Sequence, residues 1–184
     1  MRGPRDRGPF TTSREDYTAV IKETTTGDPP NTENIPVQLT ERPQWVCWRL
    51  EQRDDKLTKV PYTPGTERRV STTDLMTWRT FSEALEAYEA GEPPYDGIGF
   101  VFCSADPFVG IDLDGCRNPQ TGEIEPWAQK IVDTFASEGY VEASPSGTGV
   151  HIIVKGTQKE GARRGRVEMY GQDRYFSVTG EKIT

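Results

Sequence analysis

The sequence predicts an α+β fold with a mostly antiparallel sheet and flanking helices. Short apolar segments of strand character follow one another in groups, and two helical patterns interrupt them. Strands that come in runs, with few helices between them, are typical of α+β folds. Short connectors between consecutive strands favour antiparallel pairing. The 184 residues are enough for one domain with a hydrophobic core.

The first 37 residues differ from the rest in composition. They are rich in Pro, Thr, Arg and acidic residues and have no apolar periodicity, so we predict a disordered tail over residues 1–37. Residues 38–184 form the predicted domain. No segment is long and apolar enough to cross a membrane, and no apolar signal core follows the N-terminus. We therefore expect a cytoplasmic protein without a membrane partner.

Strand patterns recur along the predicted domain. Residues 45–50 are apolar, and residues 59–62 read as an edge strand because proline is tolerated mainly at sheet edges. The strands at 97–102 and 109–114 are joined by a short connector, which predicts an antiparallel hairpin. Further strands are expected at 140–143, 150–154, 166–170 and 175–178.

Two helices carry start and stop signals. Thr80 and Glu83 fit a capping box, apolar residues then follow at helical spacing, and Gly91 ends the pattern. Pro126 suits the first position of the second helix, which Gly139 ends. The apolar stripe of each helix is interpreted as core packing.

Asp112 and Asp114 are the first candidate site residues. They alternate along a predicted strand and therefore share one face. Neighbouring carboxylates repel each other, and a divalent cation removes that repulsion. The alternative is a strand that runs into an Asp-Gly turn with solvated acids.

The segment 146–151 is the second candidate. Its glycines let the backbone approach a ligand, Ser146 can donate to a phosphate oxygen, and His151 is the only histidine in the chain. A tight hairpin with an exposed histidine is the alternative reading.

Glu168 and a basic segment complete the candidates. Glu168 lies in an apolar strand and could be a third carboxylate for Mg²⁺ or Mn²⁺, or simply exposed. Five basic residues between 155 and 166 stand against one acid, so this segment could neutralise phosphates or be a solvated loop. The net charge of −7 argues against a protein that simply coats DNA.

Other functional classes fit less well. Asp112, Asp114 and Glu123 match three positions of a calcium loop, but Cys116 and Arg117 occupy positions that need other residues. A single histidine excludes a paired-histidine nickase motif. The three cysteines form no C-x-x-C pair, so no zinc site is predicted.

The order of the motifs is more specific than any one of them. An Asp-x-Asp strand, then Ser-Gly-x-Gly-x-His, then a strand acid resembles the catalytic domain of archaeo-eukaryotic primases, in particular the primase-polymerases of phages, plasmids and archaeal mobile elements. The matching stretches are 109–115, 144–152 and 167–170, with supporting similarity over 45–62, 71–78, 95–102 and 174–180.

This resemblance implies a template-directed nucleotidyltransferase with an RRM-like core. Asp112, Asp114 and Glu168 would be catalytic and would hold two Mg²⁺ or Mn²⁺ ions. His151 would contact the phosphates of the incoming nucleotide. The other implied or chemically chosen nucleotide-binding residues are Ser146, Gly147, Gly149, Lys59, Arg164, Arg166 and Arg174.

The implied partners are nucleoside triphosphates and a single-stranded DNA template or a primer-template. Family members usually continue into a helical segment and often a helicase domain, so we expect this chain to be truncated at its C-terminus. The alternative function is a non-catalytic RRM-like module that binds nucleotides or nucleic acid, or an inactive fragment of a replication protein. Acids at the key sheet positions favour the enzyme, because they repel phosphate without metal.

Overall fold

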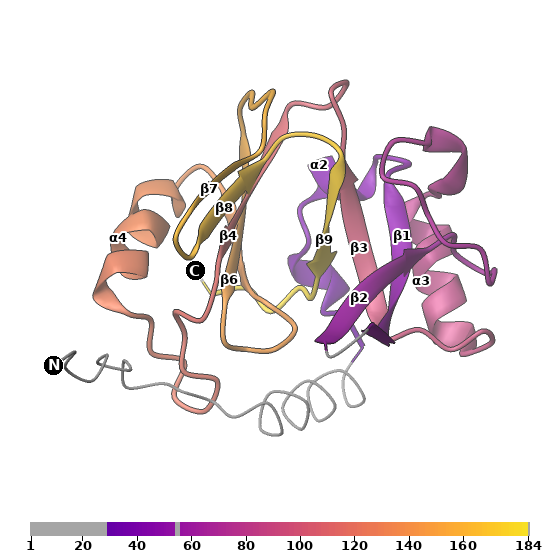
Figure 1. Ribbon diagram of the computed structural model, residues 1–184, viewed down its shortest axis with the longest axis horizontal. Helices are drawn as coiled ribbons and strands as arrows, with labels where there is room; N and C mark the ends of the chain where they lie inside the picture. Colours follow the sequence, from indigo (N-terminus) through magenta and orange to yellow (C-terminus); the bar gives the residue numbers. More distant parts are fainter. Residues whose placement is uncertain (1–28, 54–55, 184) are drawn as a thin grey trace, which may run out of the picture.

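The computed structural model describes residues 29–53 and 56–183, which form two antiparallel sheets that stand side by side (Figure 1). Sheet A has the order β2-β1-β3-β9 and sheet B the order β5-β6-β4-β8-β7. The strands of sheet A are β1 (Trp45–Arg53), β2 (Lys56–Tyr62), β3 (Gly97–Phe102) and β9 (Arg174–Val178). Those of sheet B are β4 (Phe108–Leu113), β5 (Tyr140–Ala143), β6 (Val150–Lys155), β7 (Ala162–Arg164) and β8 (Val167–Tyr170). The helices are η1 (Thr32–Asn34), α2 (Val37–Thr40), η2 (Leu75–Thr77), α3 (Phe81–Ala90) and α4 (Pro126–Phe135). The predicted α+β class is confirmed.

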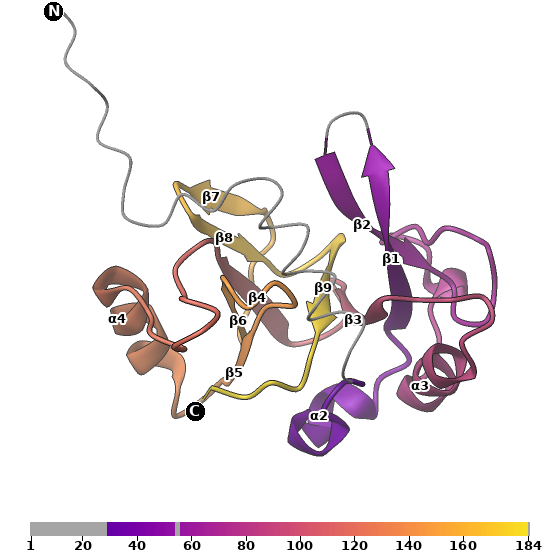
Figure 2. The same ribbon diagram turned by 90° about the horizontal axis from the view of Figure 1, so that it is seen from below.

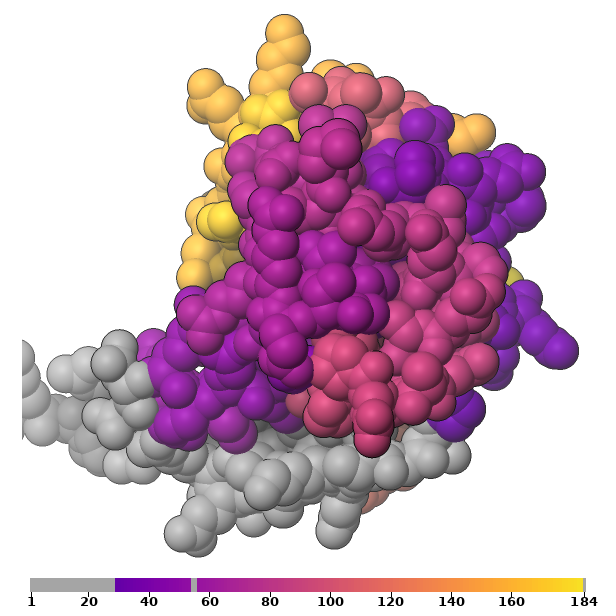
Figure 3. Space-filling view, turned by 90° about the vertical axis from the view of Figure 1, so that its right-hand side faces the viewer, coloured from indigo at the N-terminus to yellow at the C-terminus, as the bar shows by residue number. Residues whose placement is uncertain are grey.

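Helix α3 packs on the outer side of sheet A. Thr80 and Glu83 form the predicted capping box, and Gly91 ends the helix in the left-handed conformation. The predicted edge strand is also present, since β2 pairs only with β1 and carries Pro61. Figure 3 shows this face of the molecule, where α3 and the segment before it lie, coloured magenta to pink.

Sheet B and α4 form the RRM-like half. The chain passes from the central strand β4 through α4 to the antiparallel pair β5–β6, and β6 then lies beside β4. Strand β8 takes the other side of β4. This is the path of a β-α-β-β-α-β unit, except that the short strand β7 stands where the second helix would be.

The predicted hairpin between β3 and β4 is wrong. The two strands belong to different sheets, because β1 and β9 already occupy both sides of β3, while β6 and β8 occupy both sides of β4. Asp106 shapes the connector: its carboxylate accepts hydrogen bonds from the backbone N–H groups of Cys103 at 2.8 Å and Phe108 at 2.7 Å. The Gln44 side chain donates to the same carboxylate at 2.7 Å. The short connector therefore carries the chain from one sheet to the other.

The predicted tail extends too far along the chain. Ile35 is buried, the Asn31 N–H donates to the Thr179 carbonyl at 2.9 Å, and the Asn34 side chain donates to the Gly180 carbonyl at 3.0 Å. These contacts place the start of the packed domain before residue 38. Residues 1–28 of the predicted tail lie outside the described residues.

The core has a part on each side of sheet B. Ile111 and Leu113 of β4 pack with Val132 of α4. Aromatic residues of sheet A, including Phe176, pack with Tyr140 of sheet B and join the sheets. The side of β4 that carries Asp112 therefore faces away from α4. None of the helices between residues 29 and 183 is long and apolar enough to cross a membrane.

Candidate active site

Five polar residues form a row across the five strands of sheet B. In the strand register, His151 of β6 stands opposite both Glu142 of β5 and Asp112 of β4. On the other side, Glu168 of β8 stands opposite Asp112 and also opposite Arg163 of β7. Residues directly opposite each other in antiparallel strands share one face of the sheet. The row therefore presents all five side chains on the face away from α4.

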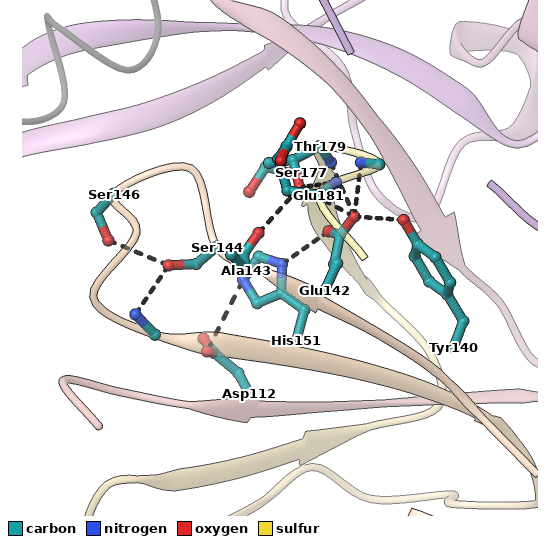
Figure 4. Close-up of polar contacts among 12 residues, drawn as sticks. Asp112, Tyr140, Glu142, Ala143, Ser144, Ser146, His151, Ser177, Thr179 and Glu181 are labelled. Atoms are coloured by element: carbon teal, nitrogen blue, oxygen red, sulfur yellow. Dashed lines mark hydrogen bonds and ion pairs between the residues drawn. The ribbon is translucent and has the colours of Figure 1, made fainter. Parts of the chain in front are cut away.

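His151 is also buried on this face, next to the fully buried Glu142. Its side chain is only 6% exposed, so the expectation of a merely exposed histidine does not hold. Nδ1 lies 3.3 Å from Glu142 Oε1, and Nε2 lies 3.8 Å from Asp112 Oδ1 (Figure 4). The imidazole also packs against the Phe176 ring of β9, with 5.0 Å between the ring centroids. The ring is thus held between two carboxylates and an aromatic residue of the other sheet.

Asp114 follows β4 by one residue and lies within electrostatic reach of the row. Desolvation raises the pKa of its carboxyl group, and the charges of Asp112 and Glu168 raise it further. Arg163 and His151 act in the opposite direction and lower this pKa. The predicted carboxylates are therefore neighbours that repel one another.

Glu168 already has partners within the protein. Its side chain is 17% exposed, and Arg163 Nη1 lies 2.8 Å from Oε1. The Tyr170 hydroxyl donates to Oε2 at 2.5 Å. Both oxygens of this carboxylate have partners within the protein.

The acids suit a divalent cation chemically, although the side chains are not arranged as a finished site. Carboxylate oxygens are the ligands preferred by Mg²⁺, and Asp112, Asp114 and Glu168 supply them on one side of the sheet. Across the described ranges, however, no three His, Cys, Asp or Glu side chains already stand where they could hold a metal ion together. A cation that used all three carboxylates would bind Glu168 beside Arg163 or in its place.

The loop 144–149 is stabilised by its own hydroxyl groups. The Ser144 hydroxyl accepts from the Gly149 N–H at 3.1 Å, and the Ser146 hydroxyl lies 3.1 Å from it. A Cβ atom on Gly149 would come within 2.9 Å of the Leu113 carbonyl, so the loop can lie against β4 only with glycine there. Gly147 has a φ of 69°, in the left-handed region. The backbone of the loop thus explains why glycine occupies both positions. Contact of either glycine with a nucleotide stays a prediction.

The predicted basic residues fall into different environments. Lys59 of β2 is half-buried and donates to the Ser177 hydroxyl at 3.3 Å. Burial lowers the pKa of Lys59, and the negative charges of Asp112, Asp114 and Glu142 raise it, which places the ammonium group in the field of the acids. Lys59 is thus the predicted cation that sheet A directs toward the row.

The three arginines lie further out. Arg164 is exposed on β7, and Arg174 of β9 lies over the Tyr170 ring with its guanidinium carbon 5.0 Å from the centroid. Arg166 instead holds the segment after β4: it donates to the Gly115 carbonyl at 2.8 Å and to both oxygens of Glu125 at 3.1 and 2.5 Å. The structure therefore gives Arg166 a local structural role.

Comparison with known proteins agrees with the motif order. No family model matches the chain. A curated protein of Nitratiruptor phage NrS-1, named "DNA Primase-polymerase", is 36% identical over 152 residues, which cover 78% of this chain and 20% of the relative. This chain is related to the primase-polymerases. The resemblance drawn from the motifs is confirmed, and the chain spans about a fifth of the length of that relative.

Sequence reasoning missed one residue of the row, Glu142, which lies outside the motif stretches. Glu142 is fully buried and contacts His151, yet the sequence only suggested an ordinary strand there. The available signal was an acid inside the apolar run 140–143. That signal becomes meaningful only when β5 is known to pair with β6.

Proposed function

We propose that the chain catalyses metal-dependent, template-directed nucleotidyl transfer in the replication of a virus, plasmid or other mobile element. The substrates would be nucleoside triphosphates and a single-stranded DNA template or primer-template. The observation that carries the proposal is the position of Asp112 between His151 and Glu168 on one face of sheet B. The similarity to a protein named DNA primase-polymerase supports it.

Asp112, Asp114 and Glu168 are the proposed ligands of Mg²⁺ or Mn²⁺. When bound, such ions activate the attacking hydroxyl and stabilise the leaving pyrophosphate. The protein contributes the rigid placement of the carboxylates, since β4 pairs with β6 and β8 on its two sides. Their mutual repulsion, seen in the raised pKa of Asp114, gives a cation a favourable place.

His151 and Lys59 are the proposed contacts of the nucleotide phosphates. They approach the acidic row from different sheets, His151 from β6 and Lys59 from β2. The His151 ring is buried and packs against Phe176, so its position is fixed before a ligand binds. Fixed groups stabilise developing charge without the need to reorganise.

The exposed arginines are the proposed contacts of DNA. Arg164 lies in the hairpin β7–β8, next to Arg163, which already touches Glu168. The net charge of the chain is −7, so a local basic segment would guide a phosphate backbone better than the surface as a whole. We propose that a helicase or a further domain of a replication protein takes part when a new primer is started.

Primer extension with Mn²⁺ or Mg²⁺ tests this function. The wild type should extend a primer on a DNA template, and the isosteric variants Asp112→Asn and Asp114→Asn should lose at least about a hundredfold in rate. Asp133→Asn is the matched control, because Asp133 is an exposed acid on α4, on the other side of sheet B. Equal rates in all four proteins would contradict the proposal.

A non-catalytic nucleotide-binding module is the second candidate. It is favoured by the partners of Glu168, which forms an ion pair with Arg163 and accepts a hydrogen bond from Tyr170. In this case nucleoside triphosphate binding, measured by calorimetry, would persist while primer extension is absent from the wild type. If the wild type neither binds nucleotide nor extends a primer, both functions are wrong.

A further inference from the structure

Glu142 is a buried carboxylate with an unusually complete set of donors. Its side chain has no exposed surface. Oε2 accepts from the Tyr140 hydroxyl at 2.8 Å, from the N–H groups of Thr179 and Gly180 at 2.9 Å each, and from the Thr179 hydroxyl at 3.1 Å. An isolated buried carboxylate is very unfavourable, and hydrogen bonds to it offset that cost.

The Tyr140 hydroxyl is a permanent donor in this set. Burial raises the pKa of Tyr140, and the neighbouring charge of Glu142 raises it further. The hydroxyl therefore keeps its proton. Two N–H groups and the Tyr140 hydroxyl donate to Oε2, and the Thr179 hydroxyl shares its one hydrogen between Oε2 and the Ala143 carbonyl at 2.9 Å, so Oε2 acts only as an acceptor.

The other oxygen of Glu142 faces His151. Oε1 lies 3.3 Å from Nδ1, and Figure 4 shows the ring between Glu142 and Asp112. A carboxylate oxygen can only accept, so a hydrogen bond here requires the proton to be on Nδ1. Nε2 is then the nitrogen on the side of Asp112.

We propose that Glu142 is a positioning residue, which holds the proton on Nδ1 of His151 and thereby presents Nε2 to the acidic row. Carboxylates that accept from the second nitrogen of a functional histidine fix its tautomer and orientation in other proteins. The proton position stands on the geometry alone. The consequence for nucleotide binding rests on the proposed function.

Glu142 also links the histidine to the junction of the two sheets. Thr179 and Gly180 directly follow β9 of sheet A, whereas Glu142 belongs to β5 of sheet B. The same carboxylate therefore contacts the ring of His151 through Oε1 and holds the segment that leads from sheet A to sheet B through Oε2. A change that disturbs one of these contacts should be felt at the other.

Glu142→Gln is the informative substitution. The amide oxygen of glutamine can occupy the Oε2 position and keep the four donors, which directs its NH₂ group at Nδ1. That NH₂ group donates, so the ring must accept at Nδ1 and carry its proton on Nε2. The variant keeps the shape of the side chain and reverses the hydrogen bond.

Nitrogen NMR of the imidazole ring reads this directly. His151 is the only histidine, so ¹⁵N-histidine labelling gives one pair of ring signals for the whole chain. We expect a protonated Nδ1 in the wild type and an unprotonated Nδ1 in Glu142→Gln. An unprotonated Nδ1 in the wild type overturns the proposal, whether or not Glu142→Gln folds. A folded Glu142→Gln protein whose ring nitrogen signals match those of the wild type also overturns it.

Tyr140→Phe is the matched control. It removes one donor to Oε2 but leaves the oxygen that faces His151. Nδ1 should stay protonated in this variant, with circular dichroism confirming that it folds. If Tyr140→Phe changes the ring signals as Glu142→Gln does, general polarity of the site sets the tautomer, and the specific role of Glu142 is wrong.

Nucleotide binding gives the second measurement. Calorimetry with a nucleoside triphosphate should show binding weakened by about tenfold in Glu142→Gln, because a ring that accepts at Nδ1 cannot become the doubly protonated cation that a phosphate attracts, and nearly unchanged binding in Tyr140→Phe. Unchanged binding in Glu142→Gln would overturn the positioning role. Because the NMR signals are read without nucleotide, absence of binding in the wild type would count against the proposed function, while the ring signals would still decide the role of Glu142.

Discussion

At the scale of single residues, Asp114 shows the repulsion among the carboxylates Asp112, Asp114 and Glu168. The pKa of this carboxyl group is raised in the folded protein by desolvation and by the charges of Asp112 and Glu168. A raised pKa means that the stability linked to this group is full below the unfolded pKa and is lost as pH rises through the folded pKa. At neutral pH, the ionised Asp114 therefore destabilises the fold.

Asp114→Asn should consequently make the folded protein more stable at pH 7. We expect the free energy of unfolding to rise by less than about 1 kcal/mol, because the side chain is exposed and solvent screens the repulsion. The gain should disappear near about pH 3, where the carboxyl group is protonated in both states. Urea unfolding at the two pH values measures this difference. A gain of equal size at both would show that charge is not its cause.

The same scale shows what sequence reasoning could reach. Asp112, Asp114 and Glu168 could be chosen as candidates because each is an acid that alternates with apolar residues in the sequence, and their role as metal ligands stays a prediction. Glu142 shows the same alternation, but its donors at Thr179 and Gly180 lie 37 and 38 residues further along the chain. Only the folded structure brings such distant backbone groups to one carboxylate.

At the scale of elements, the strand β8 is held to the loop after β4 by one side chain. Arg166, just before β8, donates to Gly115 and Glu125, and its guanidinium carbon lies 4.7 Å from the centroid of the Trp127 ring. Arg164, two residues earlier on β7, is exposed. The two arginines therefore form a natural comparison between structural and ligand-binding roles.

Arg166→Ala should lower the free energy of unfolding by about 1 kcal/mol, through loss of the ion pair and of the contact with the ring of Trp127. Arg164→Ala should leave stability within about 0.5 kcal/mol. If Arg164 contacts DNA, its loss should reduce the salt dependence of single-strand binding by roughly 0.7 in log–log slope. Thermal unfolding and binding at several salt concentrations measure the two effects. Equal stability losses in both variants would contradict the assigned roles.

Elements also show where local patterns fail. The cap at Thr80 and the proline at 126 are local signals, and both helices begin where these residues predict, although α4 ends at Phe135, before the predicted Gly139. The pairing of β3 and β4 depends on which strands reach them first in space. Because β9 comes from the end of the described chain to pair with β3, no local pattern could exclude the hairpin.

At the scale of the whole molecule, the segment 179–183 joins the two sheets. Figure 2 shows this segment, in yellow, running from β9 toward β5. The Ala143 N–H donates to the Glu181 carbonyl at 2.9 Å, and the Ile183 N–H donates to the Val141 carbonyl at 3.0 Å. The segment thereby covers the free edge of β5, which would otherwise expose unpaired backbone groups. It also brings Gly180 to the carboxylate of Glu142.

Gly180 is the point where this joining is most sensitive. Its φ is 74°, and a Cβ atom there would collide with the backbone carbonyl of Asn31. Gly180→Ala should therefore displace both the N-terminal segment and the donor to Glu142, and lower the free energy of unfolding by about 2–4 kcal/mol. Gly65→Ala is the matched control, since Gly65 has a φ of 73° but nothing within 4 Å of the added atom, so it isolates the conformational cost of roughly 1–2 kcal/mol. Urea unfolding of both variants separates the collision from the backbone effect.

Because Glu142 links the junction to His151, Gly180→Ala should also shift the ring nitrogen signals, while Gly65→Ala should leave them in place. Equal losses in the two variants, with unchanged ring signals, would mean that the junction does not control the histidine.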